Sequence, residues 1–242
     1  DGYYKFVPSA IFEILGKKSI KEINLGDNRT VPLEVLRMQI NNFEEKTRQM
    51  DAGKLFGFLN RVYQLSVPVI MEKDGVVDSY FNGGLSAIYT KVGKNALDSA
   101  ISICQKLNEE KKAGRVPEFA DIELAFAISI GSQMVGIVGH DRRLSEVTLS
   151  EQISMVDYLR KVAGKYKARI LVTGTAVGRI PNFDSRYHAR ILGMIHVSAT
   201  DSLEKIYDVY DGDDEALREI KEYTKQNFED GVKHFMAKRF YE

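Results

Sequence analysis

The residue types that most often carry out chemistry are thinly spread along this sequence. Its four histidines do not stand at spacings typical of metal ligands; they are His140, His188, His196 and His234. No segment resembles the G-x-S-x-G turn of a serine nucleophile, and the stretches GTAVGR and GSQMVGIVG lack the Gly-Lys-Ser/Thr ending of a phosphate-binding loop. The sequence therefore predicts surface or turn positions for the histidines, and it does not indicate a zinc enzyme, a serine hydrolase or a P-loop protein.

Two clusters of charge are better explained by secondary structure than by a ligand. Arg142 and Arg143 in GHDRR could form a small cationic spot, but they equally suit the solvated end of a hairpin. An acidic run charges the first turn of the last predicted helix and favours its N-terminus through the helix dipole, which is a simpler explanation than a calcium loop. This run contains Asp211, Asp213, Asp214 and Glu215.

Composition excludes several classes of partner and location. Lys+Arg and Asp+Glu both number 34, so no basic surface for nucleic acid is expected. The single cysteine, Cys104, shares a predicted helix face with Leu97, Ile101 and Leu107, which indicates a core position and a reducing compartment. No apolar run reaches the roughly 18 residues of a membrane span, and no signal peptide is visible. Because the chain starts at Asp1 without a methionine, we expect a cytoplasmic protein or the cytosolic part of a larger membrane-anchored one, with a sensor domain or membrane segment upstream.

Hydrophobic periodicity predicts an α+β core. VPLEVLRMQI reads as a strand, and the amphipathic segment from Asp51 to about Lys73 reads as a helix. VVDSYF and LSAIYT flank Asn82-Gly83-Gly84, and Asn-Gly between apolar runs is a strong hairpin signal. Residues 95–112 are predicted to form a helix, and IELAFAISI a strand. This order of strand, helix, strand, strand, helix, strand is the ferredoxin-like βαββαβ arrangement.

Further elements are predicted on both sides of this core. FVPSAIFEILG reads as a short helix, MVGIVG as part of another hairpin, and residues 151–166 as a helix. RILVT, RILGMIHVS and LEKIYDVY read as strands, and residues 213–242 as a long charged helix. We therefore expect a lead-in helix and linker in 1–30, a main domain in 31–210 and a helical extension in 211–242.

Several motifs in one order resemble the class III adenylate and guanylate cyclases. FGFLNRVYQLSVPVIMEKDGVVDSYF is similar to the family's F-x-x-LN-x-Y helix followed by the hairpin GG-x-ID-K-x-x-GD. SIGSQMVGIVGHDRR is similar to its H-T-G-x-x-x-x-G-x-x-G-x-x-x-R hairpin, with Gly131, Gly136, Gly139 and Arg143 in register. KFVPSAIFEILGKKSIKEINLGD and the tail from Tyr207 onward resemble the segments that flank this domain in bacterial members. The resemblance covers nearly the whole chain and implies a bacterial-type cyclase homology domain.

The resemblance also implies a two-metal site whose ligands are absent here. The family binds two Mg²⁺ or Mn²⁺ ions, with the phosphates of ATP or GTP, through two aspartates. Aligning EVLRMQINNF with V-L-F-x-D-I-x-x-F places Gln39 at the first aspartate, and aligning DGVVDSYFNGG with the hairpin motif places Gly83 at the second. Asp78 matches an earlier family aspartate that is not a metal ligand. We therefore expect Gln39 and Gly83 to be degenerate metal positions, with no metal or nucleotide cofactor.

The other functional positions of the family depart from its pattern as well. Ser79 falls at the lysine that helps to select the purine, and Val147 falls at the paired base-selecting position. Aligning VTLSEQISMVDYL with T-V-I-G-D-x-V-N-x-A-x-R-L places Ser154 at the ribose-orienting asparagine and Tyr158 at the arginine that stabilises the transition state. The phosphate-binding lysine falls at Ser198. A phenol cannot replace the forked charge of that arginine, so these catalytic positions are predicted to be degenerate.

Both halves of the family's site are thus affected. Cyclases build their sites between two protomers, and a partner in an asymmetric pair would keep one half. This chain keeps neither, so we expect a catalytically inactive, homodimerising cyclase homology domain that serves as a regulatory or scaffolding module in signal transduction. Two alternatives stay open, namely a nucleotide-sensing module without turnover and a cyclase with unorthodox site residues.

Overall fold

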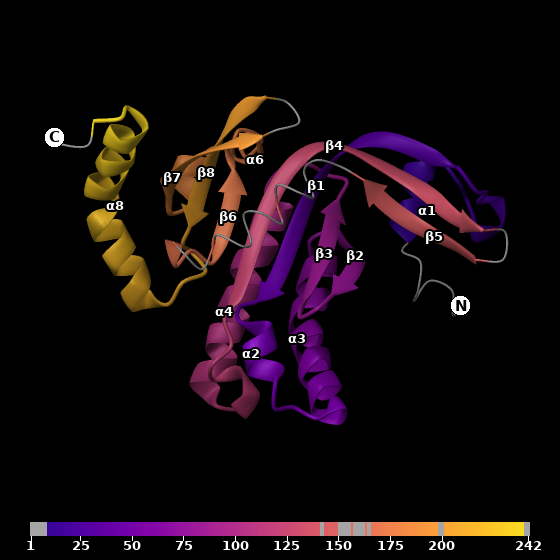
Figure 1. The fold of residues 1–242 in the computed structure, drawn as a ribbon, viewed down its shortest axis with the longest axis horizontal. Coiled ribbons are helices and arrows are strands. Elements are labelled where there is room, and N and C mark those ends of the chain that lie inside the picture. The colour runs from indigo at the N-terminus through magenta and orange to yellow at the C-terminus, as the bar shows by residue number, and fades with distance from the viewer. Residues whose placement is uncertain are drawn as a thin grey trace.

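One mixed β-sheet runs through the protein, with helices on both of its faces (Figure 1). The computed structural model describes residues 9–140, 143–149, 156, 163, 166–197 and 201–239. The strand order within them is β2-β3-β1-β4-β6-β8-β7, and β5 pairs with β4. The strands are β1 (Asn28–Ile40), β2 (Gly75–Phe81), β3 (Gly84–Tyr89), β4 (Leu124–His140), β5 (Arg143–Leu149), β6 (Ile170–Thr173), β7 (Ala189–Val197) and β8 (Ser202–Val209). The α-helices are α1 (Ser9–Leu15), α2 (Phe43–Thr47), α3 (Ala52–Glu72), α4 (Asn95–Ala113), α6 (Gly174–Val177), α7 (Phe183–Arg186) and α8 (Glu215–Met236).

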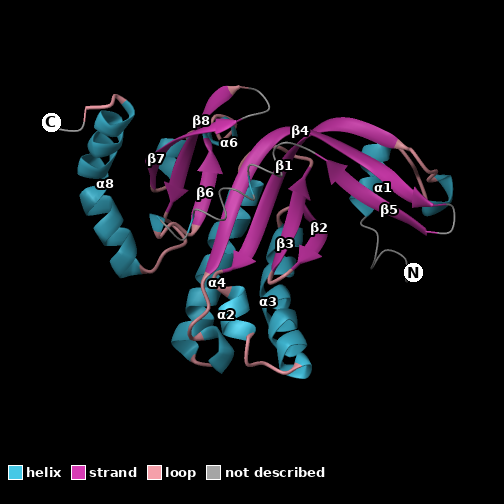
Figure 2. Cartoon of the chain, viewed as in Figure 1, coloured by secondary structure: helices cyan, strands magenta, loops and turns pink. Residues whose placement is uncertain are grey.

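The predicted ferredoxin-like core is confirmed. Strand β1, helix α3, strands β2 and β3, helix α4 and strand β4 follow one another along the chain. The neighbours in the order β2-β3-β1-β4 are antiparallel at every step. Helices α3 and α4 lie together on one side of this sheet (Figure 2). Strand β6 pairs in parallel with β4, and the antiparallel strands β8 and β7 extend the sheet beyond the core.

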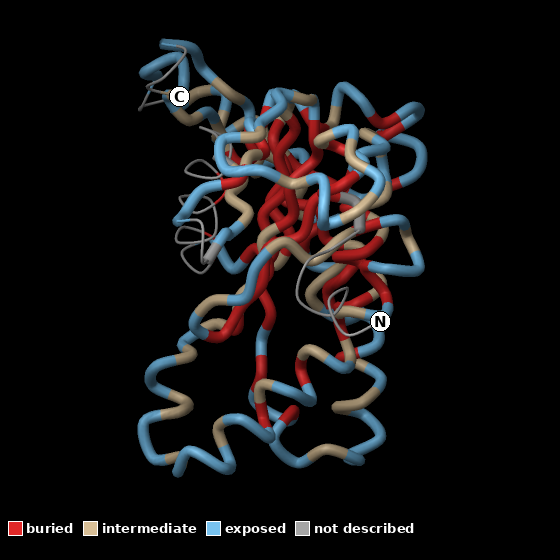
Figure 3. Tube along the Cα trace, turned by 90° about the vertical axis from the view of Figure 1, so that its right-hand side faces the viewer, coloured by how far each residue is buried: buried red, intermediate tan, exposed pale blue. Residues whose placement is uncertain are grey.

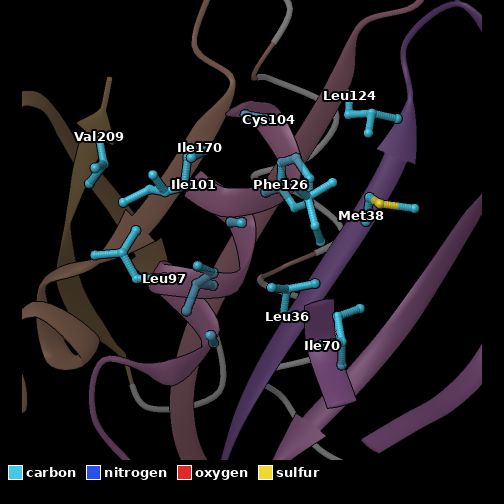
Figure 4. Packing of buried hydrophobic residues seen from close by; sticks show 14 of the residues in the cluster. Leu36, Met38, Ile70, Leu97, Ile101, Cys104, Leu124, Phe126, Ile170 and Val209 are labelled. Atoms are coloured by element: carbon cyan, nitrogen blue, oxygen red, sulfur yellow. The ribbon is translucent and has the colours of Figure 1, made fainter. Parts of the chain in front are cut away.

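The main hydrophobic core fills the space between this face of the sheet and the two helices. Alternate residues of a strand point to the same face, so Leu36 and Met38 of β1 lie beside Phe126 of β4 and meet Ile70 and Leu97 of the helices (Figure 4). Full burial of one such side chain contributes about 1.5–3 kcal/mol. Buried residues run through the middle of the molecule, whereas the outer turns are exposed (Figure 3).

Local signals at the ends of the long helices agree with the predicted boundaries. Asp51 caps α3, its carboxylate accepting a hydrogen bond from the N–H of Lys54 at 2.9 Å. Helix α4 ends where Gly114 takes a φ of 62°, which a residue without Cβ adopts easily. The predicted core position of Cys104 is confirmed, since its side chain is fully buried and burial raises the pKa of the thiol to about 11.

One carboxyl group lies inside the core without a counter-ion. Glu34 of β1 is fully buried, and neither of its side-chain oxygens has a hydrogen bond of ordinary geometry. Burial raises the pKa of this carboxyl to about 8, although the N–H groups of Ala96 and Gly93 near the start of α4 pull the pKa the other way. Glu34 is therefore protonated at neutral pH.

Strand β4 differs from the prediction, which divided it into IELAFAISI and a separate hairpin strand. It runs without a break from Leu124 to His140, pairing with β1 from Leu124 to Gly136 and with β5 from Met134 to His140. Gly131 does not interrupt it because β1 is hydrogen-bonded along that whole stretch. Beyond the core, β1, β4 and β5 curve together into an arch (Figure 1).

The face of the sheet opposite α3 and α4 carries the lead-in helix. Ile11 and Ile14 of α1 are buried against Leu33 and Val35 of β1, which confirms the short helix predicted in this segment. The helix predicted for 151–166 falls almost entirely outside the described residues. No helix in the described part of the chain is long and apolar enough to cross a membrane.

Candidate functional site

Gln39 and Gly83, the two predicted metal positions, lie together at one end of the sheet. Gln39 is the penultimate residue of β1, and Gly83 is in the turn between β2 and β3. The Nε2 of Gln39 donates a hydrogen bond to the backbone oxygen of Asn82 at 2.7 Å. The N–H of Ile40 donates to the oxygen of Gly83 at 2.8 Å. We call this region the metal end; the role of both positions stays a prediction.

Phe43 closes the space at Gly83. The φ of Gly83 is 70°, a conformation that residues with a Cβ rarely adopt. A Cβ added here would lie 2.4 Å from ring atoms of Phe43. A carboxylate at this position would therefore require both a strained backbone and a displaced aromatic ring. The local structure demands glycine.

A polar pocket of about 670 Å³ adjoins the metal end. Its charged residues are Glu44, Glu45, Arg48 and Glu123. Glu44 and Glu45 lie in the first turn of α2, where free N–H groups would otherwise favour an anion. Three carboxylates against one guanidinium make the pocket negative, and such a field opposes the entry of a polyphosphate.

The residues at the metal end do not fit two divalent ions. The amide nitrogen of Gln39 is bonded to Asn82, and Gly83 has no side chain. In the part of the chain that the structure describes, no group of three or more His, Cys, Asp or Glu is placed to hold a metal ion. Mg²⁺ and Mn²⁺ prefer carboxylate oxygens, so we derive no catalytic step through these ions here.

Ser79 and Val147, the predicted base-selecting positions, lie on strands that a side-chain hydrogen bond connects. Asp78 stands at an irregularity of β2, and its carboxylate accepts a hydrogen bond from the hydroxyl of Thr148 on β5 at 2.9 Å. Ser79 is exposed and Val147 is half-buried. Because neighbouring strand residues point to opposite faces, Val147 points away from the face on which Thr148 meets Asp78.

Glu146 is a chemically active group that the motif alignment missed. It lies two residues before Thr148 and therefore shares its face of β5. Burial and, to a lesser degree, the nearby charge of Asp78 raise the pKa of Glu146 to about 7. A carboxyl group that titrates near neutrality can both donate and accept a hydrogen bond. The alternation of Glu146 and Thr148 in the sequence was the signal that could have found it.

Three predicted positions cannot be placed. Ser154, Tyr158 and Ser198 lie outside the described residues, so their degenerate roles stay predictions. Two histidines contact carboxylates: His188 Nδ1 is 2.7 Å from Asp211 Oδ1, and His196 Nε2 is 2.8 Å from Asp201 Oδ1. His140 and His234 also have interaction partners.

The acidic run before α8 does more than charge a helix end. Asp214 caps α8, accepting a hydrogen bond from the N–H of Leu217 at 2.9 Å, as the dipole argument predicts. Asp211 instead binds His188, and Asp213 is buried against Lys221. The prediction was therefore wrong for Asp211 and Asp213, because sequence distance hid the partners that the fold supplies.

Comparison with known proteins gives relatives of one kind. No family model matches the chain. It is 23% identical over 222 residues, 90% of its length, to the terminal-differentiation specific adenylate cyclase of Dictyostelium discoideum. It is 22% identical over 176 residues, 68% of its length, to adenylate cyclase 1 of Rhizobium meliloti (strain 1021). The chain spans 10% and 26% of these two relatives, respectively.

Solved structures also resemble the chain. A bacterial light-regulated adenylyl cyclase matches with a TM-score of 0.75 at 14% identity, over 96% of this chain and 65% of that one. Two guanylyl cyclase domain structures of the RhoGC fusion protein from the fungus Blastocladiella emersonii also match. One, described as a non-canonical dimer, has a TM-score of 0.60 at 10% identity and covers 75% of this chain and 98% of that one. The other, described as monomeric, has a TM-score of 0.57 at 9% identity and covers 76% and 98%.

The fold is that of the class III adenylyl and guanylyl cyclase domains. The resemblance that the sequence motifs indicate is confirmed by this fold and by sequence relatives that are named adenylate cyclases.

Proposed function

We propose that this chain is a class III cyclase homology domain that does not cyclise nucleotides and that acts as a dimerising regulatory or scaffolding module. The observation that carries the proposal is the pair of neutral contacts at the metal end, the Gln39 amide on Asn82 and the Phe43 ring over Gly83. They occupy the positions where the alignment expects two carboxylates. Neutral groups cannot hold two cations or lower the pKa of an attacking hydroxyl.

A direct assay tests the absence of turnover. The purified chain is incubated with ATP or GTP and with Mg²⁺ or Mn²⁺, and cyclic AMP and cyclic GMP are measured. We expect no product above a heat-denatured control. Product that disappears in a Glu123→Gln variant, which alters the pocket at the metal end, would overturn the proposal.

Repair of the metal end tests the register of the alignment. Gln39→Asp with Gly83→Asp restores both carboxylates, and Phe43→Ala makes room for the second. We expect the triple variant to bind Mn²⁺ weakly in a calorimetric titration, and still not to cyclise ATP, because Ser154, Tyr158 and Ser198 lack the family's donors. A folded variant that binds no Mn²⁺ would contradict the assignment of Gln39 and Gly83.

The dimer belongs to the same proposal. Cyclase sites form between protomers, and this chain keeps the fold that builds such an interface. The structural relatives include a dimer and a monomer, so fold alone does not choose between them. We expect a homodimer through the face that forms the cleft in cyclases, with twice the chain mass by light scattering. A monomer at high protein concentration would contradict this.

Glu146 supports a second candidate, a sensor that binds a nucleoside or cyclic nucleotide without turnover. Its carboxyl group and that of Asp78 offer hydrogen bonds at the end of the fold where the alignment places base selection. The negative pocket at the metal end would oppose a triphosphate. Titration with guanosine, adenosine, cyclic GMP and GTP separates the candidates: a sensor prefers the ligands with fewer phosphates and loses affinity in Glu146→Ala, whereas a scaffold binds none.

A further inference from the structure

Helix α8 is held to the sheet in an unusual way. The structure describes all of its residues, Glu215–Met236, and the one that is buried is a lysine, Lys221, at 2% exposure. Large apolar side chains of the same helix are turned to solvent, with Ile220 60%, Tyr223 89% and Phe235 70% exposed. The helix stands at the edge of the fold beside β7 and β8 (Figure 1). No apolar side chain of this helix is fully buried, and its apolar contact with the core is limited to half-buried residues such as Phe228.

Lys221 instead enters a buried set of charges, which we call the Asp208 network: Arg190, Asp208, Asp213 and Lys221. The Nζ of Lys221 lies 3.0 Å from an oxygen of Asp208 and 2.6 Å from an oxygen of Asp213. The Nε of Arg190 lies 3.0 Å from the same oxygen of Asp208. Two positive and two negative groups balance one another, but only while Lys221 is in place.

Asp213 depends on Lys221 most strongly. Its carboxylate is buried, and neither oxygen has a hydrogen-bond partner of good geometry besides this ion pair. Burial raises the pKa of Asp213, while Lys221 lowers it. Without Lys221, Asp213 would lose its ion pair, and Arg169, whose charge lowers the pKa of Asp213 less than Lys221 does, would be its remaining compensation. A buried carboxylate without a direct partner is among the most costly situations in a protein interior.

Other contacts of α8 are polar as well, although Phe228 also packs against the apolar cluster that contains Leu192 and Ile206. The N–H of Ile191 on β7 donates to the carboxylate of Glu229 at 2.9 Å, and the hydroxyl of Tyr210 donates to Glu222. The guanidinium of Arg190 lies 4.4 Å from the ring centre of Phe228. Polar contacts of this kind exchange readily with water when a helix lifts away, because each partner can be solvated.

Under its C-terminal half the helix leaves space. A pocket of about 560 Å³ separates it from the sheet. Apolar residues of both sides line this pocket, among them Leu192, Met194, Ile206, Phe228 and Val232. Gly193 and Gly231 face no heavy atom within 4 Å of an added Cβ, so this half is loosely packed.

The loop that leads into α8 is attached separately to the core. Arg169 donates to the backbone oxygen of Gly212 at 2.8 Å, and Asn108 donates to the same oxygen at 3.3 Å. A Cβ on Gly212 would lie 2.8 Å from Cβ of Cys104, so the loop is pressed against α4. The helix can thus move while its base stays in place.

We propose that the Asp208 network is a latch and that α8 is a detachable arm, docked while Lys221 lies between Asp208 and Asp213 and released when that lysine leaves. Release returns Lys221 to water and leaves Asp208 with Arg190, its cross-strand partner. It also uncovers the apolar surface of β7 and β8 at Leu192 and Ile206. Release of α8 and exposure of this apolar surface would thus occur together, as in order–disorder transitions of other proteins. The device does not depend on nucleotide chemistry.

Hydrogen exchange on the full chain tests the latch. In Lys221→Met we expect the amides of α8 to exchange at least about 100-fold faster, while those of β1 and β4 stay within about threefold of the unaltered protein. The matched control is Lys233→Met, which removes an exposed lysine of the same helix paired with Asp230 at 2.9 Å, and it should change α8 by less than about threefold.

A charge-balanced variant separates the latch from simple damage. Lys221→Met with Asp213→Asn leaves Arg190 and Asp208 as a balanced pair but still lacks the lysine that docks the helix, so the sheet should stay as protected as in the unaltered protein while the amides of α8 still exchange at least about tenfold faster. Three results would overturn the proposal: unchanged exchange of α8 in Lys221→Met, equal acceleration of the sheet and the helix, or full recovery of α8 protection in the balanced variant, which would show that charge balance and not the lysine holds the helix.

Discussion

The metal end of the sheet and the base of α8 differ in the polar groups that they contain. At the metal end, where the cyclase fold implies charged chemistry, an amide and an aromatic ring make neutral contacts. At the base of α8, four charged side chains are buried together around Asp208. Burying charge is costly, so a protein keeps it where geometry depends on it. In this protein that place is the attachment of a helix.

Removal of Asp208 should have the largest effect. Asp208→Asn leaves the charges of Arg190 and Lys221 buried, with Asp213 as the remaining carboxylate of the network. We expect the free energy of unfolding, measured by urea titration, to fall by about 3–5 kcal/mol. Asp230→Asn breaks an exposed ion pair of the same helix and should cost less than about 1 kcal/mol. Equal losses would remove the distinction between buried and exposed charge.

A carboxylate at position 83 should cause the second largest loss of stability. Gly83→Asp combines a positive φ, costing roughly 1–2 kcal/mol, with overpacking against Phe43, costing roughly 1–3 kcal/mol. Gly57→Asp is the matched control, because a Cβ at that exposed position of α3 meets nothing within 4 Å. Thermal melts of both variants measure the difference. A Gly83→Asp protein as stable as the control would show that Phe43 does not close the site.

Neutralisation of Glu34 should stabilise the protein, by roughly 1–3 kcal/mol at pH 7. Burial raises the pKa of this carboxyl to about 8 in the folded state, whereas the unfolded chain releases the proton near the ordinary glutamate pKa of 4.5. The burial of Glu34 therefore costs no stability through ionisation below pH 4.5. This cost grows as the pH rises from 4.5 towards 8 and is largest above pH 8. Glu34→Gln should flatten this contribution, which unfolding titrations at pH 5, 7 and 8.5 would reveal. A gain that does not grow with pH would contradict a buried, protonated Glu34.

Loss of the Gln39 amide should have the smallest effect. Gln39→Ala removes one hydrogen bond to the hairpin turn and should cost about 1 kcal/mol in a urea titration. If Gln39→Ala lowered the free energy of unfolding as much as Asp208→Asn, the neutral contacts at the metal end would contribute as much stability as the buried charges of the latch. That result would contradict the difference between the two regions.

Sequence reasoning succeeded where local pattern and chain order carry the information. The hairpin at Asn82, the helix from Asp51 and the βαββαβ order all follow from turn chemistry, caps and periodicity. The alignment also paired Gln39 with Gly83, which the fold brings together.

What the sequence could not supply were partners distant along the chain. Lys221 reads as one more exposed charge of a polar helix, and only the sheet places Asp208 beneath it. Phe43 over Gly83 is hidden for the same reason, since a turn glycine gives no hint of the ring that covers it. Glu34 is a polar residue within an apolar strand, and its burial depends on α4 lying across it.

The long pairing of β1 with β4 has a consequence for biosynthesis. Strand β1 can pair with β3 once Tyr89 has been made, but its other edge has no partner until β4 emerges, beginning at Leu124. At about 5–20 residues per second, the ribosome leaves this edge open for on the order of seconds. An open, apolar strand edge recruits other chains. A pause in synthesis before β4 would prolong this exposure, whereas a chaperone that covers the edge of β1 would limit it.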